Sequence, residues 1–155
     1  MGYFATGVTI VTAHDGVETR GMTANAFMSG SLDPLLCVVS VARRANMHSH
    51  LERAGAFGVS ILSSEQQPLA SHFGGRPVAN LVVDFAPVGG IPTLPGAVAW
   101  LTAETVATYP CGDHTLFVAR VMAMQAGDGV PLLFHRGRYA ALVSERQESP
   151  APDLQ

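Results

Sequence analysis

Gly21-Met22-Thr23-Ala24-Asn25-Ala26-Phe27 is a run of small and short polar residues that lies between two predicted strands. An alternating apolar run, Val8 to Ala13, precedes it, and the turn signal Ser31-Leu32-Asp33-Pro34 follows it. Such small side chains let a flat aromatic ligand approach the backbone closely, where N–H groups can hydrogen-bond it. Gly and Asn also populate ordinary loops, so a plain strand connection is the alternative on these residues alone.

The composition favours one globular domain that associates with copies of itself. Of the 155 residues, 48% are hydrophobic and 14% are charged, against roughly 25% charged residues in an average globular chain. This length can bury a real core, and so few charges predict a homo-oligomer that covers a large apolar face. The net charge of -3 without a basic run argues against nucleic acid as a partner.

The chain carries no signal for a membrane or for an oxidising compartment. No apolar run approaches the roughly 18 residues that span a bilayer, so no membrane contact is expected. Cys37 and Cys111 have no CxxC spacing, which favours a reduced, cytoplasmic protein over a disulfide scaffold.

Alternation and turn residues predict a mostly β fold. Strands are expected at residues 8–13, 18–22, 27–31, 35–41, 57–62, 97–108, 115–126, 131–134 and 139–143, with a further short one at 81–85. Two short helices are expected at 47–54, capped by Asn46, and at 64–73, capped by Ser64 with Gln67 in the capping-box position. The set favours a closed, mostly antiparallel barrel over residues 1–145, followed by a polar, mobile tail at 146–155.

The two long strands at 97–108 and 115–126 are apolar on both faces over much of their length. Both faces cannot point into one core. One face should fill the barrel, and the other should meet a helix or a second subunit.

Common catalytic templates are missing. The chain has no Gly-x-Ser-x-Gly elbow, no HExxH, no GxGxxG after a strand and no GxxxxGK[ST] loop, so a metal site is not expected and a nucleotide-like ligand must bind by other means. Arg43 and Arg44 precede the helix start with Asn46 and Ser49, a pattern that suits a phosphate or, equally, a solvated basic turn.

Histidines mark two further polar clusters. His114, in Gly112-Asp113-His114-Thr115, could titrate near neutrality or donate to a ligand carbonyl, and a surface histidine on a hairpin is the alternative. The segment His135-Arg136-Gly137-Arg138-Tyr139 is interpreted as a solvated hairpin.

Six sequence segments, in the order in which the family has them, make the chain resemble the flavin reductase family, the split-barrel reductases that serve two-component monooxygenases. They are the segments 4–12, 21–27, 31–35, 67–73, 112–117 and 131–139. Two departures stand out: the family usually has a helix before Phe4-Ala5-Thr6-Gly7, and it commonly has serine where this chain has Ala26.

The resemblance implies a closed antiparallel split barrel with two or three short helices, and hydride transfer from NADH or NADPH to N5 of free FMN or FAD. The reduced flavin then leaves for a separate monooxygenase component, whose identity the sequence leaves open. A non-catalytic flavin-binding module and an oxidase of the pyridoxamine-phosphate type, on a similar barrel, are the alternatives.

The same resemblance assigns roles to individual residues. Thr23, Ala24, Asn25 and Ala26 would hold the flavin ring; Ser40, Ala42, Arg44, Asn46 and Ser49 would hold the ribityl chain and phosphate; Phe73 would pack nearby; His114 would orient the nicotinamide, with Tyr139 as a further candidate there. A homodimer formed by the outer faces of the long strands is also implied, with the flavin near the subunit boundary.

Overall fold

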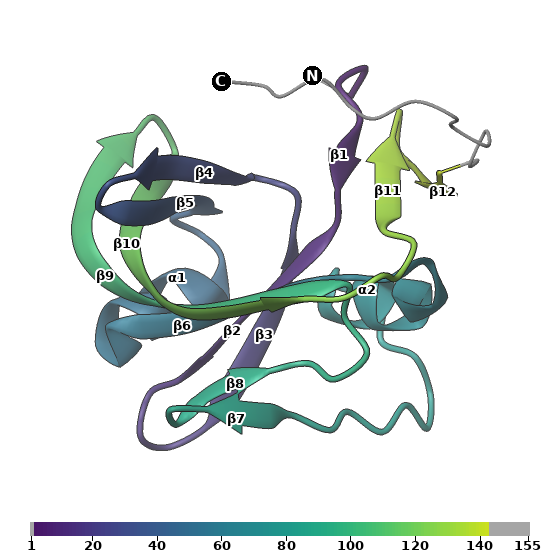
Figure 1. The fold of residues 1–155 in the computed structure, drawn as a ribbon, viewed down its shortest axis with the longest axis horizontal. Helices are drawn as coiled ribbons and strands as arrows, with labels where there is room; N and C mark the ends of the chain where they lie inside the picture. The colour runs from purple at the N-terminus through teal and green to yellow at the C-terminus, as the bar shows by residue number, and fades with distance from the viewer. Residues whose placement is uncertain (1, 143–155) are drawn as a thin grey trace.

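The computed structural model describes residues 2–142, and its fold is mostly β, as the sequence predicts (Figure 1). Seven antiparallel strands form the main sheet in the order β3-β2-β6-β9-β10-β5-β4, beside a three-stranded sheet, β1-β11-β12, and a hairpin, β7-β8. The strands are β1 (Thr6–Gly7), β2 (Thr9–His14), β3 (Thr19–Ala24), β4 (Phe27–Leu32), β5 (Leu35–Ala42), β6 (Ala56–Ile61), β7 (Ala86–Val88), β8 (Ile91–Thr93), β9 (Ala99–Cys111), β10 (His114–Ala126), β11 (Leu132–His135) and β12 (Arg138–Ala141). The helices are α1 (Asn46–Ala54), the 3-10 turn η1 (Ser64–Gln66) and α2 (Gln67–Phe73). No helix in residues 2–142 is long and apolar enough to cross a membrane.

The main sheet is open, which corrects the prediction of a closed barrel. Within residues 2–142, β3 and β4 are its two edges and no ladder joins them. Only Asn25 and Ala26, here called the Asn25–Ala26 link, separate these two strands. Neither residue has the positive φ that a two-residue hairpin turn needs. The chain therefore runs on from one edge to the other, and the Ser40 N–H already donates to the Ala26 carbonyl at 3.0 Å.

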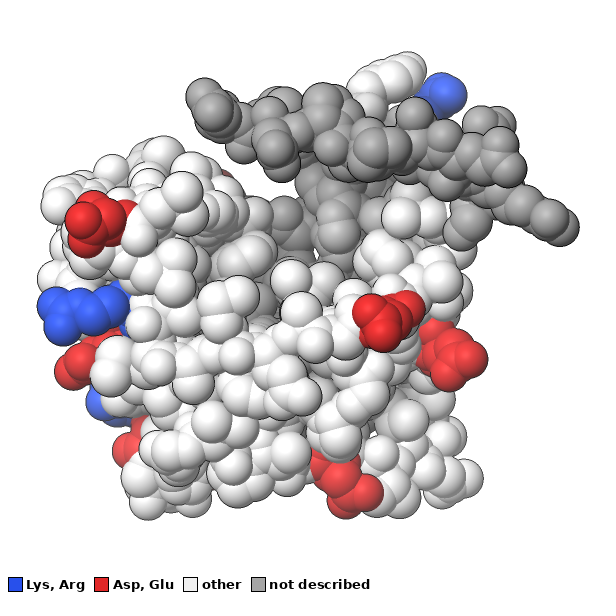
Figure 2. Space-filling view, in the orientation of Figure 1, with Lys and Arg blue, Asp and Glu red and all other residues white. Residues whose placement is uncertain are grey.

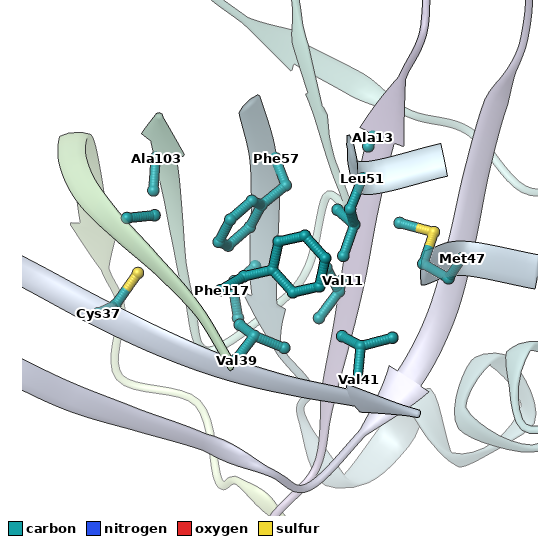
Figure 3. Close-up of a cluster of buried hydrophobic side chains, with 12 residues drawn as sticks. Val11, Ala13, Cys37, Val39, Val41, Met47, Leu51, Phe57, Ala103 and Phe117 are labelled. Carbon is teal, nitrogen blue, oxygen red and sulfur yellow. The ribbon is translucent and has the colours of Figure 1, made fainter. Parts of the chain in front are cut away.

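One hydrophobic core fills the space between the curved sheet and α1 (Figure 3). Phe57 from β6 and Phe117 from β10 are fully buried and lie next to each other at its centre. Met47 and Leu51 from α1 close it on one side. Each large side chain buried in this way contributes roughly 2 kcal/mol, so this cluster holds α1 and the sheet in fixed positions.

The β7-β8 hairpin packs against the main sheet where β2 and β6 pair. The Thr12 hydroxyl donates to the Pro92 carbonyl, and the Leu94 N–H donates to the Ser60 hydroxyl at 3.0 Å. At Gly58, on β6, a Cβ atom would collide with the Pro92 carbonyl. The hairpin can pack this closely only because position 58 is glycine.

A carboxylate joins the β2-β3 hairpin to α1. Asp15 Oδ1 accepts from the N–H groups of Val17 and Glu18, both at 3.1 Å, and its Oδ2 accepts from Arg53 Nη2 at 3.0 Å. His50, fully buried on α1, places Nδ1 3.2 Å from the same Oδ2. The two backbone hydrogen bonds, and then Arg53 and His50, hold the pKa of Asp15 well below its usual range. This carboxylate therefore fixes α1 against the hairpin.

The two predicted helix caps are each displaced by one residue. Ala45 is the N-cap of α1 and Asn46 is its first helical residue, while Gly55 takes the left-handed conformation just past the end, as expected. The capping box predicted for the second helix is formed by Ser63 and Gln66, whose Oε1 accepts from the Ser63 N–H at 3.1 Å. The capped element is thus the 3-10 turn η1, and α2 follows it directly with Pro68 near its start.

Two strand predictions also need correction. No strand forms at residues 81–85; the strands of that segment are β7 and β8, where Gly89 and Gly90 both have positive φ and make the turn. The connection left between the expected strands 97–108 and 115–126 is also shorter than predicted, because Cys111 pairs with His114 across a turn of Gly112 and Asp113. The predicted tail at 146–155 and the last residue of the strand predicted at 139–143 lie outside the described residues.

The register of β4, β5 and β10 separates an inner from an outer row. Val39 pairs with Phe27 and Phe117, and all three belong to the core. Val38, one residue earlier, pairs with Met28 and Val118, which face the opposite side. Met28 is 58% exposed. The sheet thus carries an apolar outer face, as the two-faced pattern of the long strands predicts.

Candidate functional site

Three hydrogen bonds from three different elements hold the Gly21–Phe27 segment. The Thr9 hydroxyl on β2 donates to the Ala24 carbonyl at 2.7 Å, and the Thr23 hydroxyl donates to the Ala70 carbonyl on α2 at 2.8 Å. On the other side, the Ala26 carbonyl is bonded to β5. These bonds tie the segment to β2, α2 and β5.

A cavity of about 470 Å³, here called the hairpin cavity, opens on one side of this segment. Thr23, Ala24 and Asn25 form one wall, and Phe134 and Tyr139 of the β11-β12 hairpin form another. The two rings are in edge contact, with centroids 5.5 Å apart. The volume is within the range of small-molecule sites, and the mix of aromatic and short polar groups suits a flat heterocycle.

A second cavity, of about 530 Å³ and here called the outer cavity, is also bordered by Asn25. It is lined mainly by apolar side chains on the outer face, among them Met28, Val38 and Leu116, together with Ala26 and Ser40. Asn25 and Phe134 border both cavities. The link between the two sheet edges therefore separates two adjoining spaces.

Phe73 and Asn46, which are far apart in sequence, meet at a third cavity of about 450 Å³ beside β3. A Cβ atom at Gly21 would lie 2.7 Å from Phe73 Cε1, so the ring rests directly on the glycine backbone. Phe85 packs behind the ring, with centroids 6.3 Å apart. Gly21 thereby decides where the Phe73 ring lies.

The structure brings most of the proposed ligand-binding residues to these three spaces. Thr23, Ala24, Asn25 and Tyr139 share the hairpin cavity, Asn25, Ala26 and Ser40 share the outer cavity, and Asn46 and Phe73 share the third. Ala42, Arg44, Ser49 and His114 border none of the three.

His114 lies at the start of β10, paired with Ala42. Its Nδ1 is 2.7 Å from Asp113 Oδ1, and this contact lowers the pKa of the Asp113 carboxyl. The side chain is 42% exposed. Its assignment to the nicotinamide stays a prediction, because His114 contacts a carboxylate and borders none of the three cavities.

Sequence reasoning missed Ser71, Arg76 and Arg138, which also border the hairpin cavity. Gly74-Gly75 just after α2 is a signal for a helix end that turns the chain back, and it could have placed Arg76 near that helix. Arg138 lies in the polar cluster 135–139, which sequence reasoning noted but interpreted as a solvated hairpin.

The cavities that adjoin at the small-residue link of this open antiparallel sheet have a size and lining that suit flat, partly apolar ligands. The chain belongs to the family described as the flavin reductase like domain, which it matches over residues 1–143. The resemblance drawn from the six sequence segments is thereby confirmed.

Relatives of known name cover nearly the whole chain. An NADH-dependent flavin reductase from a Rhodococcus species is 42% identical over 153 residues, which are 97% of this chain and 87% of that one. The reductase component of the 4-hydroxyphenylacetate 3-monooxygenase of Thermus thermophilus is 43% identical over 144 residues, 92% and 93% of the two chains. The solved structure of the flavin reductase PheA2 has a TM-score of 0.90 at 39% identity, with 93% and 94% covered.

Proposed function

We propose that this protein is an NAD(P)H:flavin oxidoreductase that supplies reduced FMN or FAD to a separate monooxygenase. The observation that carries the proposal is the 42% identity, across 97% of the chain, to a relative named as an NADH-dependent flavin reductase. The Thermus relative is named as the reductase component of a monooxygenase, which supports a separate partner enzyme. NADH is therefore the first hydride donor to test.

The proposed chemistry needs two rings in contact and little else. A hydride with its electron pair passes from C4 of the dihydronicotinamide to N5 of the flavin; the donor becomes oxidised, and the reduced flavin leaves. Because the two substrates carry this chemistry, the protein acts by binding, orienting and excluding water. This agrees with a site made of backbone, small residues and aromatic rings.

The flavin is assigned to the region around the Asn25–Ala26 link. The segment 23–26 would hold the ring, and the mainly apolar outer cavity suits the dimethylbenzene edge of a flavin. Ser40, Ala42, Arg44, Asn46 and Ser49 would hold the ribityl chain and phosphate. The start of α1 supports a phosphate there, because its N-cap, Ala45, offers no side-chain acceptor to the first N–H groups of the helix. Those N–H groups are therefore available to phosphate oxygens.

A direct assay tests the proposal. Purified protein is mixed anaerobically with NADH or NADPH and with FMN or FAD, in all four pairings, and the nicotinamide absorbance is followed. The proposal expects catalytic loss of that absorbance with at least one pairing. No consumption in any pairing, with flavin binding retained, would overturn it in favour of a flavin-binding module. Oxygen-dependent oxidation of pyridoxamine phosphate would overturn it in favour of the oxidase.

His114→Ala is expected to lower turnover with NADH about tenfold while leaving flavin affinity unchanged, since it removes one orienting hydrogen bond. Steady-state rates and a flavin titration measure the two effects separately. His14→Ala, which removes another exposed histidine from the β2-β3 hairpin, is the matched control. Rates equal to those of wild type would contradict the assignment.

The outer face is proposed to form a homodimer, with the flavin near the subunit boundary. The apolar row Met28, Val38 and Val118 supports this. Figure 2 shows few charged side chains on the side of the molecule in view, in agreement with the low charged fraction of the chain. The outer cavity opens on the same side as this row. The cytoplasm is the proposed compartment, since Cys37 and Cys111 are both free thiols.

Analytical ultracentrifugation should find the wild-type protein at about twice the 16.3 kDa of one chain. Met28→Asp should weaken self-association at least about 100-fold, because it places an unpaired charge in the interface. Val17→Asp, at a side chain that is 88% exposed on the β2-β3 hairpin, is the control and should stay dimeric. A wild-type mass of one chain would refute the dimer.

A further inference from the structure

The hairpin cavity has two cationic side chains at its border and no acidic one. Arg76 and Arg138 are its charged residues, and no Asp or Glu of the described chain lines it. Of the other described arginines, Arg20 pairs with Glu18 at 2.6 Å and Arg53 pairs with Asp15 at 3.0 Å, whereas the remaining four form no ion pair within residues 2–142: Arg43, Arg44, Arg120 and Arg136. Within residues 2–142, neither Arg76 nor Arg138 has a carboxylate within 4.0 Å.

The fold places Arg76 at the cavity through the end of α2. The Gly74 N–H donates to the Ala70 carbonyl at 3.0 Å, and the Arg76 N–H donates to the Ser71 carbonyl, also at 3.0 Å. Gly75, between them, has φ +87. The Arg76 bond, together with the left-handed Gly75, is the six-to-one bond of a Schellman motif, which turns the chain back over the last helical turn and anchors Arg76 beside Ser71.

Arg138 is placed by an equally defined turn. His135 pairs with Arg138, and the two residues between them, Arg136 and Gly137, have φ 51 and φ 78. Two positive φ values make this a tight hairpin turn, so Arg138 starts β12 at a fixed position. Both arginines thus project from ordered backbone at the cavity where Thr23, Ala24 and Asn25 form the wall.

We propose that Arg76 and Arg138 bind the diphosphate group of a dinucleotide in the hairpin cavity, and we assign that dinucleotide to the nicotinamide substrate. Guanidinium groups are well suited to phosphate oxygens, and two of them match a doubly charged diphosphate. This inference rests on the proposed function. There, the flavin ring lies at the Asn25–Ala26 link and its phosphate runs toward α1. A nicotinamide stacked on that ring would then extend into the hairpin cavity, which adjoins the outer cavity at Asn25 and Phe134.

FAD also carries a diphosphate, so the experiment separates the two sources by the choice of substrates. In the first arm, NADH reduces FMN, which has no diphosphate. Arg76→Gln and Arg138→Gln should each raise the KM for NADH about tenfold, and the double variant about 100-fold, with little change in kcat. In the second arm, 1-benzyl-1,4-dihydronicotinamide, which has no phosphate, replaces NADH, and all variants should match wild type with either FMN or FAD.

Arg136→Gln is the matched control. It removes the same charge from the same hairpin, but Arg136 does not border this cavity, and its guanidinium lies 4.8 Å from the centre of the Tyr3 ring. Its KM for NADH should equal that of wild type. High salt should raise the KM for NADH of wild type and leave that of the double variant nearly unchanged.

Two results would overturn the inference. One is an unchanged KM for NADH in the double variant. The other is a higher KM for FAD but not for FMN in the second arm, which would assign the arginines to the flavin. Wild-type protein that is inactive in every arm would instead defeat the proposed function, and NADH binding followed by its fluorescence would then test the arginine pair separately.

Discussion

Gly58→Ala is expected to lower the free energy of unfolding by about 3 kcal/mol and the melting temperature by roughly 10 °C. The added Cβ would collide with the Pro92 carbonyl and lie 2.8 Å from the Thr12 hydroxyl. Those two groups are hydrogen-bonded to each other, so neither can move without breaking that bond. Either the β7-β8 hairpin lifts off or β6 distorts. Thermal unfolding followed by circular dichroism measures the loss.

Gly7→Ala is the control for this substitution. Gly7 is also in a strand, but a Cβ atom there would meet nothing within 4 Å, and its φ is not positive. Its stability should change by less than about 1 kcal/mol. If Gly58→Ala proves as stable as Gly7→Ala, the close packing of the hairpin on β6 is wrong.

Gly21→Val is expected to weaken flavin binding at least about tenfold while the protein stays folded. Even the first added carbon would lie 2.7 Å from the Phe73 ring, which must then move. Moving the Phe73 ring costs packing contacts, because His72 and Phe85 lie against it with ring centroids 5.2 Å and 6.3 Å away. A flavin titration followed by fluorescence gives the affinity, and the melting temperature reports the fold.

A double-mutant cycle tests whether Phe73 transmits this effect. Once Phe73→Ala has removed the ring, Gly21→Val should cost little further affinity. Additive losses would mean that the valine blocks the flavin directly. An unchanged affinity in Gly21→Val alone would remove the third cavity from the flavin site.

Sequence periodicity was sufficient to predict most of the strands and both helices. Alternation over residues 8–13 and the two-faced pattern of the long strands follow from the geometry of a strand, which a local window captures. The first cap could not be predicted by propensity, because Asn46 is the better N-cap and yet Ala45 takes that position. For the second cap, Ser63 and its neighbour Ser64 fit the role equally well in isolation. The open sheet could not be predicted, because it depends on the backbone conformation of Asn25 and Ala26.

The site was predictable where its residues are contiguous and not where the fold assembles it. The segment 21–27 stood out by composition, and its residues do border two cavities. Arg76, at a helix end, and Arg138, at a hairpin turn, lie 62 positions apart in the sequence, and only the fold brings them to one cavity. No local sequence pattern could therefore link them. His114 had a local motif, but a motif does not say which space its ring faces.

The Asn25–Ala26 link also has a consequence for the dynamics of the sheet. Edge strands have a neighbour on one side only, so β3 and β4 belong to the parts of the main sheet that open at the lowest free energy. A flavin bound at the link would contact the end of one edge and the start of the other. Its binding free energy would then add to the cost of opening either strand. Site occupancy would appear as slower amide hydrogen exchange in two strands that, in the described residues, form no ladder with each other.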